Sequence, residues 1–163
     1  MKVIVAAAAV LLVSATEGNQ EQHIQALRRC DRVQLVSTAD WVRSDQQDGF
    51  SLLLPPCFQP VADAPRYVHG GNRWRCGTIK VEVVWGSWGS DSFKDPEACG
   101  ATLSGIPVTV ASRSNDGTPG VFVRYFTGLV HDPIIAAVDT RSADVLLLTT
   151  IAYSGQVVVT RLP

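Results

Sequence analysis

A run in the middle of the chain, TIKVEVVW (residues 78–85), alternates between two kinds of side chain. Ile79, Val81, Val83 and Trp85 fall on one side of an extended strand, and mostly polar residues fall on the other. Alternation with a period of two is typical of an antiparallel sheet that buries one face. The run therefore predicts a β-strand with Trp85 in the core, and a fold built around an antiparallel sheet.

Other β-rich runs lie on both sides of this strand. Residues 50–54 end at two prolines, which cannot donate a hydrogen bond to a sheet ladder. GIPVTVASR and GVFVRYF flank the segment SNDGTPG, which is typical of a hairpin with a long tip. We also expect strands in VQLVS (33–37), in RYVHGGNRW before a turn at residues 70–72, and in IIAAVDT (134–140).

Two segments bear on the helical content. EGNQEQHIQALRRC (17–30) carries Ile24 and Leu27 on one side and predicts a helix. Residues 142–160 leave two alternatives open, a helix starting near Ser142 or a hairpin turning at residues 154–155. We expect an α+β fold, an antiparallel sheet of about six strands flanked by one or two helices. The alternative is an all-β meander or sandwich.

The N-terminus indicates export. Lys2 is followed by an apolar run over residues 3–13 and then by small residues. The run is too short to cross a bilayer core of about 30 Å as a helix, but it fits a secretory signal peptide cleaved after Ala15. We expect residues 1–15 to be the signal peptide and residues 16–163 a single globular domain. That domain would be secreted or periplasmic, with no membrane span in its mature form.

Four widely spaced cysteines, Cys30, Cys57, Cys76 and Cys99, agree with export. In an oxidising compartment they most simply form two disulfides, and three pairings are open. No Cys-x-x-Cys pair occurs, and structural zinc sites usually use such close pairs. The spacing therefore favours disulfides over a metal site.

Charge and motifs argue against several classes of protein. The net charge is −1, and no basic run exceeds Arg28–Arg29, so a nucleic-acid partner is not expected. The chain has neither a phosphate-binding glycine loop nor a dinucleotide fingerprint. The acidic stretch SDSFKDPEAC lacks the ligand spacing of a calcium loop. We therefore expect no cofactor and no metal.

Several segments together resemble the PsbP-like α+β fold of small exported bacterial domains. The resembling residues are FSLLLPPCFQPV (50–61), IKVEVVWG (79–86), GIPVTVASR, GVFVRYF and ADVLLLTTIAYS. The resemblance implies roles mostly in binding and assembly, and it transfers no active site. The four cysteines depart from the family's pattern.

Aromatic residues provide the candidate contact surface. Trp88 follows the strand that ends at Trp85, in a glycine- and serine-rich loop at residues 86–93. Aromatic side chains anchor protein interfaces because they bury a large area at small entropic cost. The sequence predicts binding residues Trp88, Asp91, Phe93 and Trp74. It also predicts a non-enzymatic module for protein binding or envelope assembly, whose partner is another exported or envelope protein.

An alternative is a small secreted hydrolase. His131 and Asp132 form an adjacent histidine–carboxylate pair, and Ser87, Ser90 or Ser92 could supply a nucleophile. No Gly-x-Ser-x-Gly motif is present, and His-Asp-Pro is an ordinary turn composition. We therefore assign no catalytic residue. Inhibition of a secreted enzyme is a further alternative, and the oligomeric state stays open.

Overall fold

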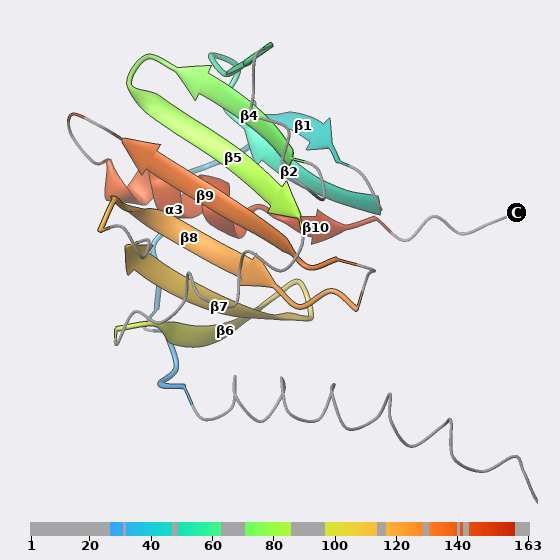
Figure 1. Cartoon of the computed structure of the whole chain (residues 1–163), viewed down its shortest axis with the longest axis vertical. Helices are drawn as coiled ribbons and strands as arrows, with labels where there is room; N and C mark the ends of the chain where they lie inside the picture. The colour runs from blue at the N-terminus through green and yellow to red at the C-terminus, as the bar shows by residue number, and fades with distance from the viewer. Residues whose placement is uncertain are drawn as a thin grey trace, which may run out of the picture.

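The computed structural model describes residues 27–30, 32–46, 49–62, 71–85, 97–113, 117–128, 131–139, 141 and 144–158 (Figure 1). The expected signal peptide over residues 1–15 and its cleavage site after Ala15 lie outside the described residues. So do residues 17–26, which make up most of the expected first helix.

The described chain is mostly β and forms two antiparallel sheets. The larger sheet has seven strands in the order β3-β4-β5-β9-β8-β7-β6. These are β3 (Gln59–Pro60), β4 (Gly71–Cys76), β5 (Ile79–Trp85), β6 (Cys99–Leu103), β7 (Ile106–Arg113), β8 (Pro119–Tyr125) and β9 (Pro133–Asp139). The smaller sheet contains β1 (Val42–Asp45), β2 (Phe50–Leu54) and β10 (Gln156–Val157) in the order β1-β2-β10. One short helix, α3 (Val145–Tyr153), is found among the described residues.

This architecture shows that the predicted α+β fold is wrong. There are two sheets of three and seven strands instead of one sheet of about six flanked by helices, and the fold is closer to the all-β alternative. The end of the expected first helix is extended, because Arg29 forms a parallel β-bridge with Gly100. Residues 33–37 form no strand, and Gly71 begins β4 instead of lying in a turn.

Several strands were predicted correctly from the sequence. The alternating run is β5, residues 50–54 are β2, and residues 134–139 lie in β9. The expected hairpin is formed by β7 and β8, which pair in antiparallel register. Within the larger sheet, β8 lies next to β9 and β7 lies between β8 and the edge strand β6.

The main core lies between the larger sheet and a second layer made of α3 and the smaller sheet (Figure 1). Phe50 makes edge-to-face contacts with Trp85 at 5.7 Å and with Tyr125 at 5.2 Å between ring centroids. The Tyr125 hydroxyl donates to the carbonyl of Ala152 and accepts from the N–H of Gly155. A Cβ on Gly155 would lie 2.5 Å from the Tyr125 ring, so only glycine allows this close packing.

For residues 142–160 the sequence leaves a helix and a hairpin open, and the structure has a helix, α3. The Asp144 carboxylate caps its N-terminus by accepting from the N–H of Leu147, and the hydroxyls of Thr149 and Thr150 donate to carbonyls one turn earlier. Leu148 and Ile151 are buried in the main core. Local threonine content therefore does not prevent a helix, because capping and burial stabilise it. The chain then continues into β10 after Tyr153.

Candidate functional site

The ends of several strands meet at one end of the larger sheet, which we call the Trp85 end. Trp85, the last residue of β5, pairs with Pro133, the first residue of β9. Tyr125 ends β8 and pairs with Val108 near the start of β7. The Trp85 end is therefore where the chain leaves β5 toward residues 86–93 and where the His131–Asp132 pair enters β9.

Asp132 is held in place by residues at the end of β8. Its Oδ1 accepts a hydrogen bond from the backbone N–H of Thr127 at 3.1 Å, and its Oδ2 lies 3.5 Å from Nη2 of Arg124. Burial raises the pKa of the Asp132 carboxyl, while the contacts with Thr127 and Arg124 act in the opposite direction. The described contacts of Asp132 thus stabilise the connection between β8 and β9.

Arg124 completes this cluster. Its guanidinium carbon lies 4.9 Å from the centre of the Phe126 ring, a cation–π arrangement. Its Nε is buried and has no hydrogen-bond partner in the part of the chain that the structure describes. Only about a sixth of each side chain is exposed, 16% for Arg124 and 15% for Asp132, so their ion pair is largely shielded from solvent. The carboxylate that would orient a catalytic histidine therefore interacts with Arg124 and Thr127.

An open pocket of about 540 Å³ lies at the same end of the molecule. Its lining is uncharged and comes from three separate parts of the chain: Ser104, Gly105, Ile106, Thr127, Gln156 and Val157. Ser104 and Gly105 connect β6 to β7 in a two-residue turn with positive φ at both positions, 50° and 80°. The Ser-Gly pair between two β-rich runs is the sequence signal that could have located this turn.

The predicted contact residues divide into two groups. Trp88, Asp91 and Phe93 lie outside the described residues, as do Ser87, Ser90 and Ser92, so their roles stay predictions. Trp74 lies in the main hydrophobic core and is 8% exposed. Little of its surface is available to a partner.

The four cysteines form two disulfides, as predicted. The bonds join Cys30 to Cys99 and Cys57 to Cys76. The first connects the start of β6 to residues 28–30, far from it in the sequence, and the second connects the turn after β2 to the end of β4. Within the part of the chain that the structure describes, no group of three His, Cys, Asp or Glu side chains is placed to hold a metal ion.

Comparisons with known proteins do not assign the chain to a family. No protein-family model matches the chain, and a search of curated proteins finds no match. The resemblance of residues 50–61 and 79–86 to the PsbP-like fold therefore stays a prediction. Among the described residues, no helix is long and apolar enough to cross a membrane.

The raised pKa of Asp132 leads to a prediction about stability and pH. An unfolded Asp132 has a pKa near 3.8, and the folded protein keeps its proton to higher pH. The contribution of Asp132 to the free energy of unfolding is therefore largest below that value, and it falls as the pH rises through the raised pKa. We compare the free energy of unfolding of the wild type with that of Asp132→Asn. The difference, wild type minus variant, should fall as the pH rises from the unfolded pKa through the raised folded pKa, and should then level off. Urea denaturation of both proteins between about pH 3 and pH 7 measures it. A difference that grows with pH would contradict the pKa direction.

Proposed function

We propose that the chain is an exported, disulfide-stabilised domain that binds another exported or envelope protein. Support for export comes from the two disulfides, because such bonds persist in oxidising compartments and are rare in the cytosol. The N-terminal sequence gives independent support, since it has the charge and length of a signal peptide. The mature protein would begin at Thr16.

The observation that carries the binding role is the geometry of the Trp85 end. Strand β5, which precedes Trp88 in the sequence, ends there at Trp85, and the uncharged pocket opens at the same end. An uncharged pocket suits protein side chains or small neutral groups. Binding to a secreted enzyme, and thereby inhibiting it, is one form that this function takes.

A second candidate function, a small hydrolase, is supported by the pairing of β5 with β9. Because Trp85 pairs with Pro133, the serine-bearing residues 86–93 follow directly from a position beside the His131–Asp132 pair. A hydrolase would use His131 as the general base for one of these serines. Asp132 would then have to orient His131 while keeping its contacts with Thr127 and Arg124.

Export is tested by the intact mass of the protein produced with its own N-terminus in an export-competent host. We expect loss of residues 1–15 together with the four hydrogens removed by two disulfides, measured without reductant. A full-length mass with free thiols would contradict the proposed location.

Two matched variants separate the binding role from the hydrolase. In the binding role, Trp88→Ala should weaken capture of the partner by at least about tenfold and leave the free energy of unfolding unchanged, while His131→Ala leaves binding intact. In the hydrolase, His131→Ala should abolish ester or peptide hydrolysis. Binding is measured by titration calorimetry with the purified partner, and hydrolysis with a panel of ester and peptide substrates. A Trp88→Ala variant that is destabilised would instead place Trp88 among the packed residues of the fold.

A further inference from the structure

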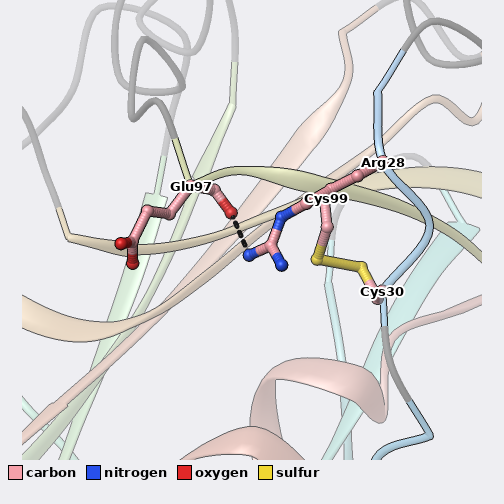
Figure 2. Close-up of a disulfide and its surroundings, with 4 residues drawn as sticks. All are labelled: Arg28, Cys30, Glu97 and Cys99. Carbon is pink, nitrogen blue, oxygen red and sulfur yellow. Dashed lines mark hydrogen bonds between the residues drawn. A yellow bond between two sulfur atoms is a disulfide. The ribbon is translucent and has the colours of Figure 1, made fainter.

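The outer edge of β6 carries an extended segment of the chain itself, which we call the N-terminal strap (residues 28–30). The N–H of Gly100 donates to the carbonyl of Arg28 at 2.8 Å, and the N–H of Cys30 donates to the carbonyl of Gly100 at 3.0 Å. Figure 2 shows the disulfide between Cys30 and Cys99 and the Arg28 guanidinium, which donates to the carbonyl of Glu97 at 2.7 Å. This edge of the sheet therefore already accepts an added strand.

The strap covers only part of the edge. Since the N–H and C=O of Gly100 point away from β7, the alternation of an antiparallel strand makes those of Thr102 point outward as well. Thr102 lies opposite Pro107, which has no N–H and whose carbonyl accepts from the N–H of Phe126. Thr102 is exposed, and among the described residues the hydrogen bonds between the strap and β6 involve Gly100 alone. The backbone of Thr102 is thus open to a further strand.

The uncharged pocket begins two residues beyond Thr102, at Ser104. A second open strand edge faces it from the other layer. The N–H of Val158 donates to the carbonyl of Gly49 in line with the β10–β2 pairing, so the N–H and C=O of Val157 point away from β2. Val157 itself lines the pocket. The pocket is therefore flanked by two strand edges, one from each sheet.

We propose that the free end of the β6 edge and this pocket bind an extended peptide segment of a partner protein by strand addition. Backbone hydrogen bonds to Thr102 would hold the segment, and the pocket would select the side chains that follow. The strap shows that an extended segment fits this edge, and the bound peptide would continue along the same line toward Ser104. Because the pocket lining has no charged residue, it would take uncharged side chains. This inference rests on the proposed protein-binding function and specifies the chemistry of the partner.

The test uses a displayed library of linear peptides selected on the oxidised mature protein. Thr102→Pro removes the outward N–H without removing a hydrogen bond to β7, while Thr102→Val keeps that N–H. We expect the selected peptides to bind Thr102→Pro at least about tenfold more weakly and Thr102→Val within about twofold of the wild type. On binding, the amide of Thr102 should gain protection from hydrogen exchange. Gln156→Arg, which adds a charge at the pocket, should also weaken binding if Thr102→Pro fails to fold.

Three outcomes would overturn the inference. These are peptides that bind Thr102→Pro as well as the wild type, a selection that yields no binder, and association of two copies through Thr102 without any peptide. The proposed protein-binding function has its own readout. If capture of a protein partner depends on Trp88 and survives Thr102→Pro, the strand-addition site is wrong and the binding function stands.

Discussion

Replacing both Cys30 and Cys99 with serine should lower the free energy of unfolding by about 4 kcal/mol. The bond joins residues separated by 69 positions, so its loss frees a long loop in the unfolded chain. The described backbone hydrogen bonds between the strap and β6 involve Gly100, and the added freedom of residues 28–30 acts in the same direction. Guanidinium denaturation of the mature protein without reductant measures the change.

The matched control replaces Cys57 and Cys76. This bond spans 19 positions, and the same chain-entropy argument gives about 3 kcal/mol. Only the Cys30/Cys99 variant should also lose hydrogen-exchange protection at the amide of Gly100, since only that disulfide joins the strap to β6, where this amide donates to Arg28. A larger loss in the Cys57/Cys76 variant, or an unchanged Gly100 amide in the Cys30/Cys99 variant, would contradict the role given to the strap.

Strands with one buried face were accessible from the sequence. In β5, residues 81, 83 and 85 are buried while the residues between them are only partly so, and this difference is what the alternation reflects. The number of disulfides was also predictable, because four distant cysteines without a Cys-x-x-Cys pair most simply form two bonds. Their pairing was not, since it depends on which strand lies at the edge of the sheet.

The fold class was wrong because the strands form two sheets and the described residues contain one short helix. Tertiary contacts also override local preference at two places. Residues 27–30 follow a helical pattern, yet Arg29 bridges to β6 beside the Cys30–Cys99 bond. Residues 33–37 look like a strand, yet their described contacts include a hydrogen bond from the N–H of Val36 to the hydroxyl of Thr150 in α3. Gly100 and Thr150, the residues contacted, are far from these segments in the sequence, so no local pattern predicts the contacts.

The candidate site shows the same limit. His131 and Asp132 are adjacent in the sequence and suggest a dyad, but Asp132 interacts with Arg124 and Thr127 at the end of the neighbouring strand. The pocket combines the turn after β6, a residue after β8 and a strand after α3. A site assembled from three distant segments becomes visible only when the order of strands is known.

The second large effect concerns Trp85, the last residue of the alternating run that predicted a core strand. The side chain is 1% exposed and packs edge to face on Phe50, so Trp85→Ala should lower the free energy of unfolding by about 3–5 kcal/mol. Val145→Ala is a control on an apolar residue that is 60% exposed, and it should change stability by less than about 0.5 kcal/mol. Both are measured by guanidinium denaturation under the same conditions.

Trp85→Phe separates packing from hydrogen bonding at the same position. The indole Nε1 is buried and has no hydrogen-bond partner among the described residues, so phenylalanine removes a donor that they leave unsatisfied as well as part of the ring. The gain from removing that donor offsets part of the loss in packing, and Trp85→Phe should therefore cost less than half as much as Trp85→Ala. Equal losses in the two variants would mean that the indole N–H contributes to stability and that the edge-to-face contact with Phe50 does not account for the effect.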